Sequence, residues 1–229
     1  VATDMETVKK VNQSIEEAGI VTAVGFQDRY LDIIARAKEY IKGHEIGIVY
    51  GAWIGGIPGV PWWRKKEQSG GQIVEQSIHI IDMMRYFLGE AETVYSVGKS
   101  GIVKDLPGYD IEDYSATVIT FKNGVVATLF TGCYVSDQAP NIGNGITFVC
   151  RDVRIEYELR SHVRFIKQHS LEEYRSVNNP GMKADRTFID AVKAKDPSMV
   201  LSPYKDSMKS MEIALAANQS IETGMPVKI

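Results

Sequence analysis

Between residues 92 and 167 the chain changes from helical patterns to an unbroken series of strand-like segments. These segments are residues 92–99, 114–122, 124–134, 144–150, 152–159 and 161–167, with turn-forming residues between them. Asn123 and Gly124 stand between two β-rich runs, which is the pattern of a tight hairpin. Because consecutive strands without intervening helices pair with neighbours that run the opposite way, the series predicts a mostly antiparallel sheet.

Helical patterns flank this strand series on both sides. Apolar residues recur at helical spacing in residues 4–18, 30–41, 71–87, 183–195 and 203–222, and residues 46–55 add one more strand. So few helices cannot cover both faces of such a sheet. The predicted fold class is therefore α+β, with helices packed on one face of the sheet and the other face open. We expect this open face to pair copies of the chain into a homo-oligomer.

The beginning of the chain has a pattern of its own. Thr3 and Glu6 have capping-box spacing ahead of the first helix. Residues 20–26 form a short, nearly continuous apolar run, which is typical of a strand buried in a parallel sheet. A helix and a buried strand with no earlier strand resemble the second half of a βαβ unit. We therefore divide the chain into residues 1–27, a remnant of a truncated domain, and residues 28–229, a C-terminal α/β domain.

Composition argues against several classes of partner. The 229 residues carry a formal net charge of −3, and the basic residues are scattered, so a nucleic-acid partner is not expected. No apolar run approaches the roughly 18 residues of a membrane span, so a membrane partner is not expected either. The two cysteines, Cys133 and Cys150, lie in predicted strands and fit a reducing, cytoplasmic location better than a disulfide framework.

The predicted helix that begins at Gly71 carries the residues that point to chemistry. Spacings of three and four place its polar residues on one face: Gln72, Glu75, Gln76, His79 and Asp82. Glu75 could orient the imidazole of His79 and make it a general acid or base. From the pattern alone, however, such a pair is more often a surface hydrogen bond than a catalytic pair. A metal site made of Glu75, His79 and Asp82 is a third interpretation, which no further His or Cys cluster supports.

Four ordered segments of the chain resemble the Gfo/Idh/MocA oxidoreductases. Residues 69–82 are similar to the family signature Gly-Gly-x-x-x-Asp-x-Gly-x-His-x-x-Asp, with Glu75 in place of Asp and Ser77 in place of Gly. The other segments are residues 24–30, 63–64 and 220–227. The resemblance implies an enzyme that transfers hydride between NAD or NADP and a sugar, an inositol or a related polyol, with that small molecule as its partner.

The resemblance also implies roles for individual residues. His79 and Glu75 would be catalytic, and no metal is implied. The substrate-binding residues would be Arg64, Trp63, Gln76 and Tyr134. Arg29 would contact the cofactor, with a salt bridge between domains as its alternative role.

The same resemblance implies a nucleotide-binding, Rossmann-like domain ahead of this chain, of which residues 1–27 would be the last helix and strand. That domain would hold the dinucleotide-binding glycines and a lysine that works with His79. We therefore expect the cofactor to be bound mainly outside this chain, and the fragment alone to be inactive. Residues 28–229 would be the substrate-binding and oligomerisation domain.

Two other functions fit the same residues. Some relatives look like nicotinamide-dependent glycosidases, which oxidise, eliminate and reduce within one cycle and so cause no net reduction of the cofactor. A non-catalytic domain for dimerisation or ligand sensing is the other alternative. It predicts that replacing His79 changes nothing except stability.

Overall fold

A nine-stranded sheet forms the centre of the described part of the chain, which in this computed structural model comprises residues 2–139 and 143–229. The strand order is β8-β7-β6-β5-β1-β4-β3-β2-β9. The strands are β1 Ile46–Gly55, β2 Ala91–Lys99, β3 Tyr114–Phe121, β4 Val126–Cys133, β5 Gly145–Cys150, β6 Arg154–Glu158, β7 His162–Lys167, β8 Ser170–Arg175 and β9 Val227–Lys228. Among these strands only β1 and β4 pair in parallel. The predicted α+β fold with a mostly antiparallel sheet is confirmed.

The hairpin between β3 and β4 forms where the Asn-Gly pair predicts it. Gly124 has φ +88°, a conformation that glycine adopts without strain. The Asn123 side chain accepts a hydrogen bond from Val125 N at 3.1 Å and donates one to Leu88 O at 2.9 Å. The turn therefore sets the register of the two strands. It also anchors the hairpin to Leu88, the last residue of helix α4 (Ile78–Leu88).

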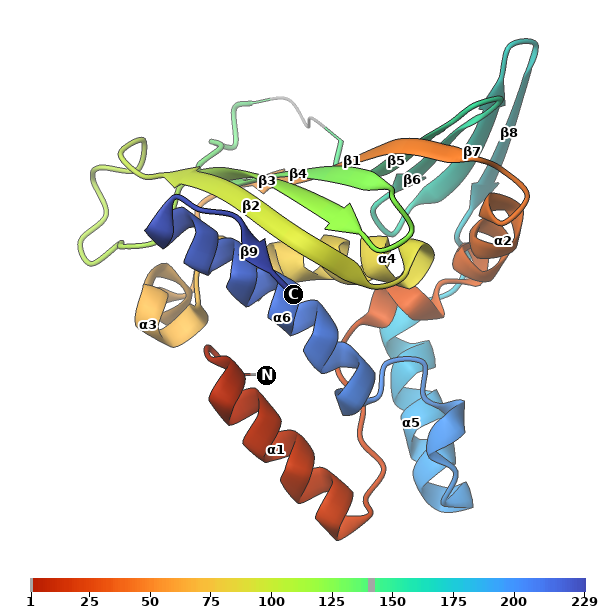
Figure 1. Ribbon diagram of the computed structural model, residues 1–229, viewed down its shortest axis with the longest axis horizontal. Helices are drawn as coiled ribbons and strands as arrows, with labels where there is room; N and C mark the ends of the chain where they lie inside the picture. Colours follow the sequence, from red (N-terminus) through yellow and green to blue (C-terminus); the bar gives the residue numbers. More distant parts are fainter. Residues whose placement is uncertain (1, 140–142) are drawn as a thin grey trace.

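The helices lie on one side of the sheet. They are α1 Met5–Ala18, α2 Asp32–Ile41, α3 Lys66–Ser69, α4 Ile78–Leu88, α5 Pro180–Ala194 and α6 Tyr204–Thr223. Shorter helical turns are η1 Gln27–Tyr30, η2 Pro61–Arg64, η3 Ile73–Ser77 and η4 Pro197–Met199. Figure 1 shows α4 and α6 against the same sheet face, with α1 beyond α6. Ile80 and Met84 of α4 are fully buried in this layer, as is Leu129 of β4, so burial of apolar surface holds the helices to the sheet. None of the helices in the described residues is long and apolar enough to cross a bilayer.

The opposite face of the sheet is open, as predicted. In the described part of the chain no helix covers it (Figure 1). Large apolar side chains of β1–β4 are exposed there: Ile48, Tyr50, Tyr95, Val97, Tyr114, Val118, Val126 and Phe130. A contiguous apolar surface on a folded domain marks a site of association.

Residues 20–26 are not a strand, so this prediction was wrong. Ile20 is 58% exposed, and no described strand pairs with the segment. Val24 N instead donates to Ser202 O at 2.8 Å, and Ser202 Oγ donates to Val24 O at 2.7 Å. An apolar run becomes a strand only where a neighbouring strand completes its ladder.

Three further details of the secondary structure differ from expectation. The N-cap of α1 is Asp4, whose carboxylate accepts from Thr7 N at 2.7 Å, and the capping box predicted at Thr3 does not form. Strands β8 and β9 were not predicted, because neither has the alternating apolar pattern of a half-buried strand. The division into residues 1–27 and 28–229 stays a prediction.

Candidate functional site

The helix that carries the predicted site begins with a π-helical turn. Gly70 and Gly71 have φ +75° and +84°, which glycine adopts far more easily than other residues. The π-helical turn η3 follows and continues directly into α4. Turns of this type are rare and occur often at functional sites. The helix predicted over residues 71–87 is thus present, but its first turn does not keep α-helical spacing.

His79 lies in the first turn of α4, half-buried between two aromatic side chains. Its ring centroid is 5.9 Å from that of Phe26 and 5.8 Å from that of Trp53. Nδ1 is enclosed and makes no hydrogen bond to any described residue. Burial lowers the pKa of His79, while the charge of Asp28 raises it and that of Arg160 lowers it. Burial therefore favours the neutral imidazole, which is the form that can accept a proton.

Asp28, which is buried, forms an ion pair with Arg160, whose side chain is one-third exposed. Asp28 is 1% exposed, and its Oδ1 accepts from Arg160 Nε at 2.6 Å. Its Oδ2 is enclosed and has no hydrogen-bond partner among the described residues. The Arg160 guanidinium carbon also lies 5.7 Å from the ring centroid of Trp53. Asp28, Arg160 and Trp53 were not predicted as neighbours of His79, because no local sequence pattern identifies them.

Glu75 and Gln76 lie in the π-helical turn, close to His79 in the chain. Burial raises the pKa of Glu75, so its carboxyl group binds a proton more readily than usual. Glu75 and His79 make no hydrogen bond to each other in this described segment. The Gln76 side chain accepts a hydrogen bond from Gln72, which also donates to Gly132 O at 3.3 Å. The catalytic role of Glu75 and the substrate role of Gln76 stay predictions.

Trp63 and Arg64 lie together in η2. Arg64 donates to Pro58 O at 2.7 Å and to Gly59 O at 3.2 Å, so the backbone of its own loop holds the guanidinium. Trp63 packs against Trp62 with ring centroids 6.3 Å apart. The indole N–H of Trp63 is enclosed without a hydrogen-bond partner among the described residues. The substrate roles of Trp63 and Arg64 stay predictions.

Tyr134 lies across the sheet from His79. Its ring centroid is 5.8 Å from that of Tyr114, whose side chain is on the open face. A Cβ atom at Gly132 would lie 2.9 Å from Tyr134 Cε1, which places the Tyr134 ring over the same face. Trp53, which contacts His79, points to the helix-covered face. The structure therefore does not bring Tyr134 and His79 together, and the substrate role of Tyr134 stays a prediction.

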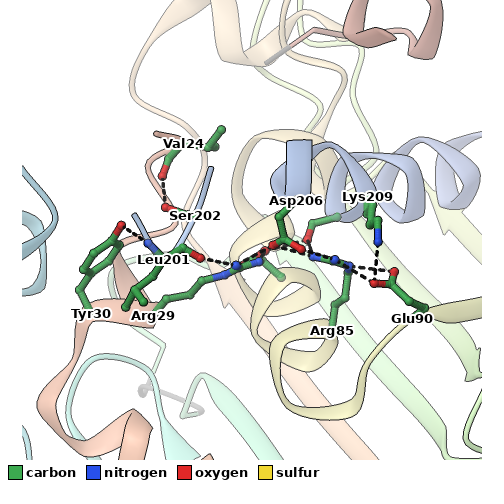
Figure 2. Close-up of polar contacts among 11 residues, drawn as sticks. Val24, Arg29, Tyr30, Arg85, Glu90, Leu201, Ser202, Asp206 and Lys209 are labelled. Carbon is green, nitrogen blue, oxygen red and sulfur yellow. Dashed lines mark hydrogen bonds and ion pairs between the residues drawn. The ribbon is translucent and has the colours of Figure 1, made fainter. Parts of the chain in front are cut away.

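Arg29 is the buried start of an ion-pair network that reaches the surface at Glu90 and Lys209 (Figure 2). Its guanidinium binds both carboxylate oxygens of Asp82, at 2.8 and 2.6 Å, and Asp206 Oδ2 at 2.7 Å. Arg85 donates to Asp206 Oδ1 at 2.6 Å and to Glu90 Oε1 at 3.1 Å. Arg29 therefore makes salt bridges within this chain, joining η1, α4 and α6. Its predicted contact with the cofactor stays untested.

A metal site made of Glu75, His79 and Asp82 would need the carboxylate of Asp82, which is bound by Arg29. Asp82 directs both oxygens to the guanidinium, so they are not turned towards His79. Among residues 2–139 and 143–229, no group of three His, Cys, Asp or Glu side chains is placed to hold a metal ion.

Acid unfolding should reveal the contribution of Asp206. Burial alone would raise the pKa of Asp206, but hydrogen bonds and charges from Arg85 and Arg29 lower it from 3.8 to about 2. A carboxyl group whose pKa is lowered by folding stabilises the folded state above its unfolded pKa, and this contribution disappears as the pH falls through the folded value. We expect Asp206→Asn to be less stable than wild type at neutral pH, by a difference that shrinks from about pH 4 to about pH 2.

The measurement is urea unfolding of both proteins at a series of pH values. Asp185→Asn, at an exposed position of α5, is the control and should track wild type throughout. A stability difference between Asp206→Asn and wild type that stays constant down to about pH 2 would contradict this assignment.

A dinucleotide needs a phosphate site that these residues do not form. Such a site is a glycine-rich turn between a strand and a helix N-terminus. No Gly-x-Gly-x-x-Gly sequence follows any strand of the described segments. A cavity of about 520 Å³ lies between α1, α3 and α6, but Lys66 on its wall is bound by Glu112 at 2.7 Å, and His79 does not line it. The sequence pattern of a dinucleotide phosphate site is therefore absent from the described segments.

Comparison with known proteins gives consistent matches. Residues 34–156 match the GFO/IDH/MocA C-terminal domain. An uncharacterized oxidoreductase of Bacillus subtilis is 25% identical over 240 residues, which cover 100% of this chain and 69% of that protein. The scyllo-inositol 2-dehydrogenase (NAD(+)) of the same organism is 27% identical over 252 residues, which cover 98% of this chain and 67% of that protein. The structure of levoglucosan dehydrogenase in complex with NADH and levoglucosan has a TM-score of 0.81 at 19% identity, covering 100% of this chain and 71% of its own, and shows the shared fold.

Proposed function

Because this chain belongs to the GFO/IDH/MocA family, we propose that it is the substrate-binding and catalytic part of an NAD- or NADP-dependent dehydrogenase or reductase that acts on a sugar, an inositol or a related polyol. The observation that carries the proposal is His79, a half-buried imidazole at the start of α4 that lies between Phe26 and Trp53 and whose pKa is lowered by burial. A relative that aligns over 98% of this chain is a scyllo-inositol 2-dehydrogenase (NAD(+)), which supports a polyol as substrate.

His79 acts as the acid/base group in this proposal. The nicotinamide supplies the acceptor for the hydride that leaves the carbinol carbon. His79 takes the hydroxyl proton, so the alcohol loses a hydride and a proton and becomes a carbonyl. Because Nδ1 is the enclosed nitrogen, Nε2 is the one that faces the substrate. In the reductive direction the imidazolium returns its proton to the carbonyl oxygen.

The residues around His79 bind the substrate in this proposal. Glu75, with its raised pKa, donates or accepts a hydrogen bond at a substrate hydroxyl. The unpaired indole N–H of Trp63 and the amide of Gln76 provide further polar contacts. The dinucleotide is held mainly by residues outside this chain. The relatives, of which this chain covers 69% and 67%, support that division.

The test uses the full-length protein and the absorbance of the reduced nicotinamide. A panel of sugars and inositols is assayed with NAD and with NADP. We expect substrate-dependent reduction of one cofactor by at least one member of the panel. Cleavage of a glycoside without net reduction would favour the glycosidase alternative. Failure to bind either cofactor would refute both enzymatic functions and favour a non-catalytic domain.

The open face pairs two copies of this chain, because its apolar strip over β1–β4 has no covering layer in the described residues. We expect Phe130→Lys, in the middle of that strip, to convert a dimer into a monomer, since pairing would bury an unpaired charge. Light scattering after size exclusion measures the mass. Val177→Lys is the control, because Val177 is 89% exposed and lies outside the sheet. A monomeric wild type, or a Phe130→Lys protein that stays dimeric, contradicts the pairing.

A further inference from the structure

Two enclosed polar atoms, one on the acid/base group and one on a nearby carboxylate, lack hydrogen-bond partners among the described residues. They are His79 Nδ1 and Asp28 Oδ2. An unpaired buried polar atom destabilises the folded state, so folded proteins seldom leave one without a reason. The two side chains act on each other electrostatically, because the negative charge of Asp28 favours the protonated form of His79.

Arg160 holds one oxygen of the Asp28 carboxylate. Its Nε binds Asp28 Oδ1 at 2.6 Å and leaves Oδ2 unpaired. Arg160 has φ +57°, a left-handed conformation that is strained for a residue with a side chain. Its backbone N–H donates to the Tyr157 hydroxyl at 3.1 Å, which holds the turn between β6 and β7 in this form. Strain of this kind persists where the surroundings impose it, and here it directs the guanidinium to Asp28.

The indole ring of Trp53 lies near both His79 and Arg160. Trp53 lies 5.8 Å from the His79 ring and 5.7 Å from the Arg160 guanidinium carbon. The imidazole and the guanidinium therefore lie against the same indole, and the guanidinium in turn holds the Asp28 carboxylate.

We propose that Asp28 is a positioning residue for His79, whose Nδ1–H it binds through Oδ2 as the site closes on its substrate. This inference rests on the proposed function. With the proton held on Nδ1, the lone pair of Nε2 is presented to the substrate hydroxyl, and the carboxylate stabilises the imidazolium after the proton is transferred. That proton leaves Nε2 for solvent when the product departs. Hydrogen bonds of this kind are often long in a free enzyme and shorten when the substrate binds.

Glu75 is the obvious competitor for this role, because it stands one helical turn before His79. It makes no hydrogen bond to His79, and burial raises its pKa, so it is a weaker anionic partner. Asp28 is enclosed and held by Arg160, with the Tyr157 hydroxyl beside its carboxylate. The charged groups that act on His79 are Asp28 from η1, Arg160 from the β6–β7 turn and Asp82 from α4 itself.

The first test follows the pKa of His79 in the full-length protein by proton NMR of its Hε1 resonance. Asp28→Asn removes an anion and should lower this pKa, while Arg160→Gln removes a cation and should raise it. Asp113→Asn is the matched control, because Asp113 is also a fully buried carboxylate with one unpaired oxygen but lies ahead of β3, where it binds Ile102 N. It should leave the His79 pKa unchanged. Opposite shifts in the two site variants support the proposal, and an unchanged His79 pKa in both overturns it.

The second test is kinetic. We expect Asp28→Asn to lower kcat by about 10- to 100-fold with little change in KM, and to move the acid limb of kcat/KM to lower pH. Asp28→Glu, which keeps the charge, should restore part of kcat. A loss confined to KM would make Asp28 a substrate ligand and overturn the positioning role. If Asp28→Asn does not fold, Arg160→Gln at the surface turn decides, because the proposal requires it to raise the His79 pKa and lower kcat. An inactive wild type would refute the proposed function, while the NMR titration still decides the role of Asp28.

Discussion

Replacing His79 by alanine is expected to lower kcat of the full-length enzyme by about 10²- to 10⁴-fold, which is the usual contribution of a general acid or base. The residue lies between Phe26 and Trp53 with a pKa lowered by burial, so at neutral pH it can take a proton from a substrate hydroxyl. Steady-state rates of nicotinamide reduction on the best substrate of the panel provide the measurement. Cofactor affinity should change little, since His79 is not placed to bind the phosphates.

His169 provides the control for this variant. It lies at the exposed turn between β7 and β8, so His169→Ala should keep the kcat and KM of wild type. A His79→Ala protein that folds, binds cofactor and turns over normally would contradict the acid/base role. A change in stability alone would support the non-catalytic alternative.

The architecture follows from local patterns that the sequence displays directly. Alternating apolar residues in β3 and β4, with Asn123 and Gly124 between them, specify a hairpin because strand period and turn chemistry act over a few residues. Residues 20–26 are as apolar as those strands, yet their backbone binds Ser202 instead of a ladder. Whether an apolar run becomes a strand depends on a partner distant in the chain, and composition does not show that partner.

The site was predictable only in part, for the same reason. His79 stands out because it is part of a polar stripe and a family signature. The π-helical turn before it has no recognisable composition, so the α-helical spacing assumed for Glu75 did not reveal that the two side chains make no hydrogen bond. The pair formed by Asp28 and Arg160 joins residues 132 positions apart. Such contacts follow from the tertiary fold and have no periodic signal.

Arg29→Met is expected to lower the free energy of unfolding by about 3–5 kcal/mol, the usual cost of leaving one member of a buried ion pair without its partner. Asp82 is 1% exposed and directs both of its oxygens to this guanidinium, so the variant leaves a carboxylate buried with too few donors. Asp206 and Leu201 O lose the same cation, which loosens the attachment of α6 to α4 and η1. Urea unfolding at neutral pH measures the loss from the midpoint and slope of the transition.

Arg164→Met is the control for this experiment. It separates the effect of losing a buried ion pair from the effect of losing a more exposed one. Arg164 binds Glu173 at 2.6 Å, as close as Arg29 binds Asp82, but on the solvent-facing side of β7 and β8. Its replacement should cost far less stability, because exposed ion pairs gain little over their hydrated ions. An Arg29→Met protein with unaltered stability and a raised KM for the cofactor would instead identify Arg29 as the cofactor contact that the family resemblance implies. A large loss of stability with unchanged cofactor KM would identify Arg29 as the residue that fixes η1, and with it Asp28, against the helix of His79.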